Sequence, residues 1–77
     1  MTRKADHWVD ARGHKCPVPT LRLRRALESA QVGEIVALIA DDPLARIDVP
    51  HLATSLRSPV LDILDENNEL TFWIQKS

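Results

Sequence analysis

Cys16-Pro17-Val18-Pro19 joins the only cysteine of this 77-residue chain to the expected start of a helix. Pro19 has a preset φ and no amide hydrogen, and both properties suit the first helical position, where an N–H would lack an intrahelical partner. The sequence therefore predicts a helix that starts at or just after Cys16. A thiol at this end of a helix lies near free N–H groups and the positive end of the helix dipole, which favour the thiolate, and Lys15 acts in the same direction.

The residues that follow have the spacing of an amphipathic helix. One apolar stripe repeats at i, i+3, i+4 and i+7, and it consists of Leu23, Ala26, Leu27 and Ala30. We expect this stripe to be buried and the charged residues beside it to face water. Gly33 is expected to close the helix, because glycine readily adopts the left-handed conformation.

Four segments read as strands, from their apolar runs or from alternation of apolar and polar residues: His7–Asp10, Ile35–Ala40, Val60–Asp65 and Leu70–Gln75. The second is continuously apolar, so we place it in the interior of a sheet. In the last strand, alternation buries Leu70, Phe72 and Ile74 and leaves Trp73 partly exposed on the other face. The two asparagines of Glu66-Asn67-Asn68-Glu69 predict a hairpin turn.

A second helix is expected from about Leu44. Asp42 can cap it, and Pro43 would occupy its first position. Pro50 should kink it or divide it into two pieces, with 51–56 continuing as helix. We interpret Asp42 and Asp48 as structural residues, the second facing Arg46 or a partner.

The order of the elements defines the fold class. Strand, helix, strand, helix, strand, strand predicts an α/β (α+β) two-layer sandwich of βαβαββ order, with two helices packed on one face of a four-stranded mixed sheet. A chain of this length has room for one domain, which we assign to residues 1–77.

Composition excludes several classes of function. With 44% hydrophobic and 27% charged residues the chain should fold, and its net charge of −1 gives no reason to bind nucleic acid or a membrane directly. The amino terminus lacks the apolar core of a signal peptide, and the apolar run 35–40 is too short to span a bilayer, so we expect a cytoplasmic protein. We also expect it to be a monomer.

The single cysteine excludes an internal disulfide, a C-x-x-C redox pair and a multi-cysteine zinc site. His7, His14 and His51 lack the spacing of any recognised zinc site. We therefore expect neither a metal nor a cofactor.

Four motifs together resemble the TusA/SirA-like sulfur-carrier family across nearly the whole chain: Val9-Asp10-Ala11-Arg12-Gly13, Cys16-Pro17-Val18-Pro19, Asp41-Asp42-Pro43 and Ile47-Asp48-Val49-Pro50. The resemblance implies a βαβαββ fold and a sulfur carrier with sulfurtransferase activity. It implies a persulfide on Cys16, loaded by a cysteine desulfurase or rhodanese-like donor and passed to an acceptor protein in tRNA thiolation, molybdenum-cofactor synthesis or related sulfur trafficking. The chain departs from the family at His14, where leucine is usual, and at Arg57-Ser58-Pro59, where a Gly-His-Glu-type turn is common.

Residues near the cysteine have expected roles. Gly13 forms the turn before it, and Pro17 and Pro19 hold the sulfur in one orientation. A cationic group could tune the thiolate or dock an acidic partner surface, and it consists of Arg12, His14, Lys15, Arg22, Arg24 and Arg25. The plainer interpretation is a solvated face, with Arg24 paired to Glu28.

Three alternatives stay open at this point. Cys16 could be a small buried hydrophobic residue, since free cysteine is often buried. The chain could be a regulatory or interaction module that binds a protein through the basic helix and an exposed Trp73. It could also be a thiol redox sensor, in which Cys16 forms a sulfenic acid or a disulfide with a second chain.

Overall fold

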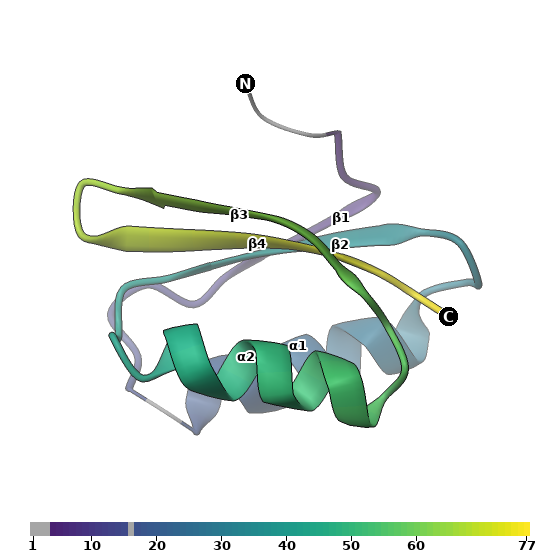
Figure 1. Cartoon of the computed structure of the whole chain (residues 1–77), viewed down its shortest axis with the longest axis horizontal. Helices are drawn as coiled ribbons and strands as arrows, with labels where there is room; N and C mark the ends of the chain where they lie inside the picture. Colours follow the sequence, from purple (N-terminus) through teal and green to yellow (C-terminus); the bar gives the residue numbers. More distant parts are fainter. Residues whose placement is uncertain (1–3, 16) are drawn as a thin grey trace.

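The computed structural model describes residues 4–15 and 17–77. The elements are β1 (His7–Asp10), α1 (Val18–Ser29), β2 (Ile35–Ala40), α2 (Ala45–Ser55), β3 (Val60–Glu66) and β4 (Glu69–Gln75). Both helices lie on one face of the four-stranded sheet (Figure 1). This arrangement confirms the predicted two-layer fold.

The sheet is mixed, with strand order β1-β2-β4-β3. β1 and β2 are parallel, whereas the β2–β4 and β3–β4 pairs are antiparallel. β2 is an interior strand, as predicted. Because β1 and β2 are parallel, α1 and its flanking loops must cross from one end of the sheet to the other, and the Cys16 segment belongs to that crossover.

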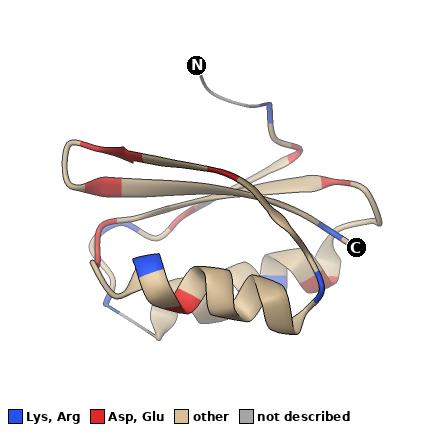
Figure 2. Ribbon diagram, viewed as in Figure 1, with Lys and Arg blue, Asp and Glu red and all other residues tan. Residues whose placement is uncertain are grey.

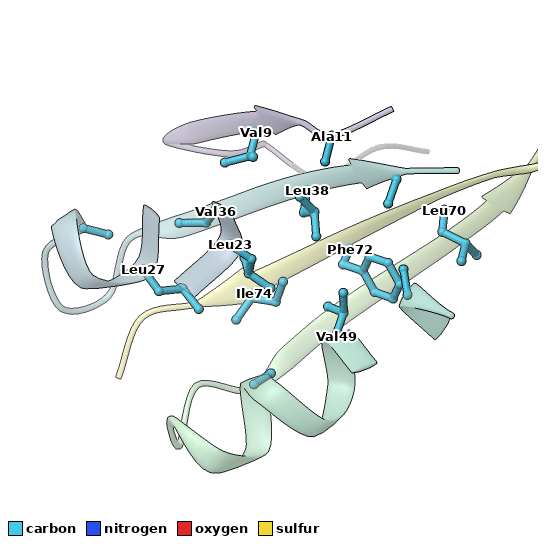
Figure 3. Close-up of a cluster of buried hydrophobic side chains, with 14 residues drawn as sticks. Val9, Ala11, Leu23, Leu27, Val36, Leu38, Val49, Leu70, Phe72 and Ile74 are labelled. Atoms are coloured by element: carbon cyan, nitrogen blue, oxygen red, sulfur yellow. The ribbon is translucent and has the colours of Figure 1, made fainter. Parts of the chain in front are cut away.

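The hydrophobic core fills the space between the helices and the sheet (Figure 3). Leu23 and Leu27 of α1 are buried there, which confirms the predicted stripe. Val49 of α2 approaches the same core, and Phe72 and Ile74 of β4 close it from the sheet side.

The other face of the sheet carries two tryptophans, Trp8 and Trp73. Trp8, Ala37 and Trp73 are in register on three neighbouring strands. Because Ala37 is small, the indole rings of Trp8 and Trp73 contact each other edge to face, with centroids 6.2 Å apart. Trp73 is only 1% exposed, whereas Trp8 is 55% exposed. The prediction of a partly exposed Trp73 was wrong, because Trp8 from another strand lies against it.

The end of α1 also differs from the prediction. The helix ends at Ser29, and the extended Ala30 donates its N–H to carbonyls of the last turn. Gly33, with a φ of +91°, lies beyond the helix in a turn where the Glu34 N–H binds the Gln31 carbonyl at 3.0 Å. Glycine is therefore required by the turn that leads into β2, and it does not cap the helix.

α2 begins at Ala45, slightly later than predicted. The Asp42 carboxylate accepts the Leu44 N–H at 3.0 Å and so stabilises the turn in front of the helix. Leu44 is the N-cap and no described side chain caps α2, so the predicted capping by Asp42 was wrong, although its role is structural. Pro43 lies in that turn and not at the first helical position. The helix runs through Pro50 as one element, so the predicted division into two pieces was wrong. Proline removes only one hydrogen bond of the helix, and the buried face of α2 packs on both sides of it.

Arg57 ends α2 in a left-handed conformation, with a φ of 56°. Its N–H binds the Thr54 carbonyl at 3.0 Å, and the Ser58 N–H binds the Ala53 carbonyl at 2.9 Å, which is the Schellman pattern. We expect Arg57→Gly to raise the free energy of unfolding by about 0.5–1 kcal/mol, because glycine adopts this conformation without the steric cost. Urea unfolding measures the change. The control is Arg24→Gly, at an exposed position inside α1, which should lower the free energy of unfolding by about 1 kcal/mol. Equal losses of stability in Arg57→Gly and Arg24→Gly would contradict the prediction.

Candidate functional site

The loop that joins β1 to α1, residues 11–17, carries the predicted site. Cys16 itself lies outside the described residues, so the site is built from its neighbours. The loop starts from a buried Ala11, whose N–H binds the Ile39 carbonyl at 2.8 Å. A turn follows, in which the His14 N–H binds the Ala11 carbonyl at 3.3 Å and Gly13 has a φ of +83°. A side chain would be strained at that φ, so the predicted need for glycine at this turn is confirmed.

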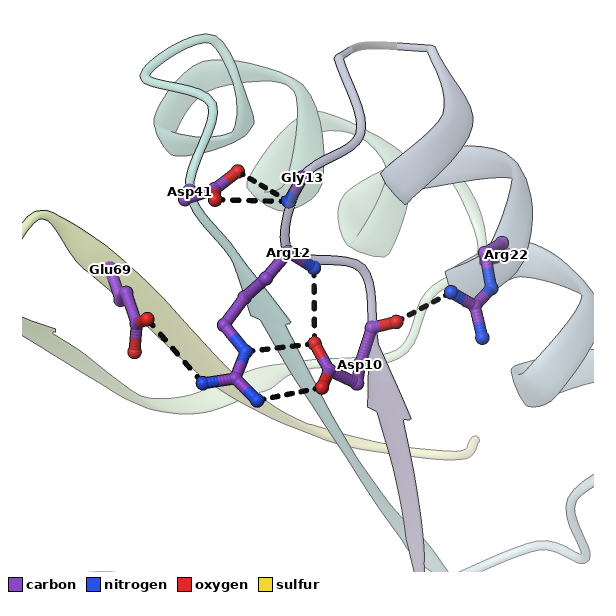
Figure 4. A network of polar contacts seen from close by, with 6 residues as sticks. All are labelled: Asp10, Arg12, Gly13, Arg22, Asp41 and Glu69. Atoms are coloured by element: carbon purple, nitrogen blue, oxygen red, sulfur yellow. Dashed lines mark hydrogen bonds and ion pairs between the residues drawn. The ribbon is translucent and has the colours of Figure 1, made fainter.

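Asp41 holds the loop from the neighbouring strand. The Gly13 N–H donates to both Asp41 carboxylate oxygens, at 3.0 and 2.9 Å (Figure 4). The contact follows from topology, because the carboxyl ends of the parallel strands β1 and β2 meet at one edge of the sheet. Asp41 belongs to the motif Asp41-Asp42-Pro43, but the sequence predicted no contact for its carboxylate. A carboxylate directly after an interior apolar strand was the signal that could have indicated one.

Arg12 is bound by carboxylates on two strands. Its Nε and Nη2 atoms lie 2.9 and 2.8 Å from the Asp10 carboxylate oxygens, and its Nη1 lies 3.5 Å from Glu69 Oε2. The side-chain hydrogen bonds from Arg12 and its backbone N–H lower the pKa of Asp10 from 3.8 to about 2, and the same pairing raises the pKa of Arg12 above its usual range. Arg12 thus ties the loop to the sheet (Figure 4), and most of its charge is compensated, contrary to its predicted place in the cationic group.

The Asp10–Arg12 pair predicts a pH dependence of stability. Because the folded pKa of Asp10 is below the unfolded value, the pair stabilises the fold above about pH 3.8, and this contribution is lost as pH falls towards 2. We expect Asp10→Asn to be less stable than the wild type at neutral pH, with the difference shrinking over that range. Thermal unfolding of both proteins at a series of pH values measures it. A difference that stays constant down to pH 2 would contradict the prediction.

The start of α1 differs from the prediction by one position. Pro17 is the N-cap, Val18 the first helical residue and Pro19 the buried second one. Neither proline carries an N–H, and the Val18 N–H binds the Lys15 carbonyl at 3.0 Å. The helix start therefore has fewer free N–H groups than predicted. The dipole of the 12-residue α1 remains, and its first turn contains no acidic residue.

The predicted cations of α1 have different partners. The Arg22 guanidinium donates to the backbone carbonyl of Asp10 at 2.5 Å, so it lies against the end of β1. Arg24 pairs with Glu28 at 3.6 Å, as predicted. Arg22 and Arg25 line a groove of about 410 Å³ between β1 and α1, whose other lining residues are Val9, Val18, Leu21, Ala26 and Ser29.

His14 and Lys15 are exposed on the loop. They line a hollow of about 240 Å³ with Gly13, Asp41, Asp42 and Pro43. The structure thus brings His14 and Lys15 beside the two aspartates that follow β2. Arg22 and Arg25 lie in the other groove, on the α1 side.

The histidines lie on separate elements. His7 of β1 lies 2.9 Å from Glu34, His14 is on the loop, and His51 is exposed on α2. The pKa of Glu34 is lowered, first by the Gln31 N–H and then by His7. In residues 4–15 and 17–77 no three His, Asp or Glu side chains gather as metal ligands would.

One predicted partner of Asp48 was Arg46, but the two side chains do not pair. The Arg46 guanidinium instead pairs with Asp65 of β3. The contact links α2 to the edge of the sheet, and sequence spacing gave no indication of it.

A solved structure of another protein has a closely similar fold. A SirA-like protein from Desulfitobacterium hafniense matches 90% of this chain and 95% of its own, with a TM-score of 0.79 and 25% identity. The chain therefore has the SirA-like α+β fold.

Sequence comparison then gives the family. The family model "Sulfurtransferase TusA" matches residues 7–76. A "Putative sulfur carrier protein" from Archaeoglobus fulgidus is 43% identical over 54 residues, or 70% of each chain. The "Putative sulfur carrier protein YrkI" of Bacillus subtilis is 36% identical over 73 residues, or 95% of this chain and 97% of its own. The chain belongs to the TusA sulfurtransferase family, which supports a sulfur-carrier function.

Across the described part of the chain, neither α1 nor α2 has the length and apolar character needed to cross a bilayer.

Proposed function

We propose that the protein accepts a sulfane sulfur on Cys16 as a persulfide and delivers it to an acceptor protein. The observation that carries the proposal is the family match over residues 7–76, a range that contains the only cysteine. The described neighbours support it, because His14, Lys15 and Pro17 are exposed on both sides of that position. Lys15 and the start of α1 supply positive charge, which favours a thiolate.

The chemistry needs one sulfur atom and no cofactor. The Cys16 thiolate attacks the outer sulfur of a donor persulfide, a new S–S bond forms on Cys16, and the donor's S–S bond breaks to release the donor thiolate. The acceptor then attacks the outer sulfur of the Cys16 persulfide, and Cys16 leaves as a thiolate. The chain has no second thiol that could collapse the persulfide into an internal disulfide.

The partners of this cycle are proteins. A cysteine desulfurase or a rhodanese-like enzyme is the proposed donor, and an acceptor sulfurtransferase in tRNA thiolation, molybdenum-cofactor synthesis or related sulfur trafficking is the proposed recipient. The cations Lys15, Arg22 and Arg25 would orient an acidic partner surface beside the loop. We place this exchange in the cytoplasm, with the protein acting as a monomer and a single domain.

An interaction module that binds through Trp73 is disfavoured, because Trp73 is buried beside Trp8. No contact in the described residues favours the redox-sensor alternative over sulfur transfer.

The test is intact mass spectrometry after incubation with cysteine and a cysteine desulfurase. We expect the wild type to gain one sulfur, about 32 Da, that a reductant removes, and Cys16→Ser to gain none. Failure of several desulfurases and rhodaneses to load a wild-type protein whose thiol is still alkylated would contradict the proposal.

A further inference from the structure

The outer edge of β1 has no strand beside it in the described part of the chain. β1 stands first in the strand order β1-β2-β4-β3, so it pairs with β2 alone. The Ala11 N–H binds β2, so the carbonyl of the same trans peptide unit, that of Asp10, points away from β2. Arg22 donates to this carbonyl (Figure 4), and the carbonyl keeps a second lone pair for another donor. β1 therefore offers backbone groups at an open edge.

Apolar side chains are exposed on both sides of this edge. On the helix side lies the groove of about 410 Å³ between β1 and α1, along which Leu21 and Val18 are 59% and 37% exposed. On the opposite side lies the ring of Trp8, supported edge-on by Trp73. Successive side chains of a strand point to opposite faces, so one extended segment paired with β1 would cover both sides.

The groove carries positive charge. Two of its lining residues are Arg22 and Arg25, and no aspartate or glutamate of the described chain lines it. The Asp10 carboxylate, at the end of β1, is bound by Arg12. Among the described residues, no carboxylate pairs with Arg25. Acidic side chains that enter the groove would therefore meet an uncompensated guanidinium.

The other edge of the sheet is less suited to pairing. The charged residues of β3 are all acidic, Asp62, Asp65 and Glu66 (Figure 2), and its register with β4 shifts between Val60 and Asp62. Charges and irregularities of this kind protect an edge strand from pairing. The register of β1 with β2 is continuous from His7 to Asp10, so β1 is the edge that favours an added strand.

We propose that the outer edge of β1 binds an extended acidic segment of a partner protein, which pairs with β1 as a further strand and places its carboxylates against Arg25 and Arg22. In this mode of recognition, backbone pairing supplies affinity and the alternate side chains supply specificity. β-Branched side chains on the other face of the added strand cover Trp8. The proposal rests on the proposed function only for the identity of the partner, because strand pairing does not involve Cys16.

Other occupants fit this edge less well. Pairing with β1 of a second copy, about an axis perpendicular to the sheet, would set the two α1 helices side by side with their arginines facing each other. A basic segment would be repelled by Arg25 in the same way. Nucleic acid has no peptide groups that could continue the sheet.

The length of the groove sets the length of the probe. Its lining on α1 extends from Val18 to Ser29, which is about 16 Å along a helix and matches an extended chain of about five residues. The probe is acetyl-Glu-Val-Glu-Val-Glu-amide, titrated into the full-length ¹⁵N-labelled protein. We expect chemical shift changes at the β1 amides, at the Trp8 indole N–H and at the Arg25 Nε–H.

Two matched comparisons test the charge and the strand pairing separately. Arg25→Gln should weaken the peptide's Kd roughly two- to fivefold, the effect of one exposed ion pair. Arg24→Gln removes the same charge from the neighbouring position, where Arg24 pairs with Glu28 outside the groove, and should leave the Kd unchanged. The same peptide with every backbone nitrogen methylated keeps its carboxylates but donates no backbone hydrogen bond, so it should bind roughly tenfold more weakly.

The proposal is overturned by equal weakening in Arg25→Gln and Arg24→Gln, by equal binding of the methylated peptide, or by shift changes confined to β3. Equal binding of acetyl-Lys-Val-Lys-Val-Lys-amide, or no shift change at millimolar peptide, would also overturn it. Shifts of the β1 amides that depend on protein concentration without peptide would assign the edge to a second copy instead. Peptide binding and sulfur loading are separate measurements, so failure of one leaves the other result unaffected. Far-UV circular dichroism on each variant confirms that the fold is intact.

Discussion

Trp73→Ala is expected to leave the protein only marginally stable under native conditions. The side chain is 1% exposed, and truncating a buried tryptophan costs about 3–5 kcal/mol through lost transfer energy and the cavity that remains. A domain of this size has a total stability near the low end of about 5–15 kcal/mol, so the variant retains little. Urea unfolding followed by far-UV circular dichroism measures the loss without relying on the altered fluorescence.

Trp8→Ala is the matched control, because it removes the same side chain from the other half of the aromatic pair. Trp8 is half exposed, so we expect a loss of about 1–2 kcal/mol from its buried edge and the ring contact. Equal losses for the two variants would show that Trp73 is not the buried member of the pair.

The wrong prediction for Trp73 shows what periodicity cannot supply. Alternation in 70–75 correctly placed Trp73 opposite Phe72. Whether the face that carries Trp73 is exposed to solvent depends on which strand lies two positions away in the sheet. Alternation of apolar and polar residues does not encode strand order. Trp8 reaches Trp73 only because β1 neighbours β2 and because Ala37 between them is small.

Local signals predicted local structure well. The apolar run 35–40 became the interior β2, and Asn67 and Asn68 adopt positive φ angles of 55° and 63° in the hairpin turn. Where two local signals competed, the prediction failed. Gly33 could either close α1 or form the turn into β2, and in the structure it forms the turn.

At the candidate site, too, local features were predictable from the sequence and long-range contacts were not. Gly13 was predictable, because a turn after a strand favours glycine. The partners that fix the loop were not, since Asp41 and Glu69 are 28 and 57 residues away from Gly13 and Arg12. Arg12 was predicted to belong to the cationic group because its carboxylate partners become neighbours only once the sheet is assembled.

If Cys16 carries sulfur as proposed, Asp41→Ala should slow its loading by about 10- to 100-fold, because a small displacement of a reacting atom has an effect of that size. Asp41 fixes the Gly13 N–H three residues before the cysteine. Its loss should lower the free energy of unfolding by about 1.5–3 kcal/mol, the value of one hydrogen bond to a charged group. The measurement is the rate of persulfide formation by intact mass, at a donor concentration where the wild-type rate is first order in carrier.

Two further variants separate positioning of the loop from general stability. Asp41→Asn keeps an oxygen acceptor for the Gly13 N–H, so it should recover most of the loading rate. Glu34→Ala removes a carboxylate at the other end of β2, where it accepts the Gln31 N–H at 2.8 Å, and it should lower stability by a similar amount without slowing loading. Slow loading in Glu34→Ala would attribute the effect to general loosening of the fold. Equal rates for Asp41→Ala and the wild type would show that the hydrogen bond from Gly13 does not position the reacting sulfur.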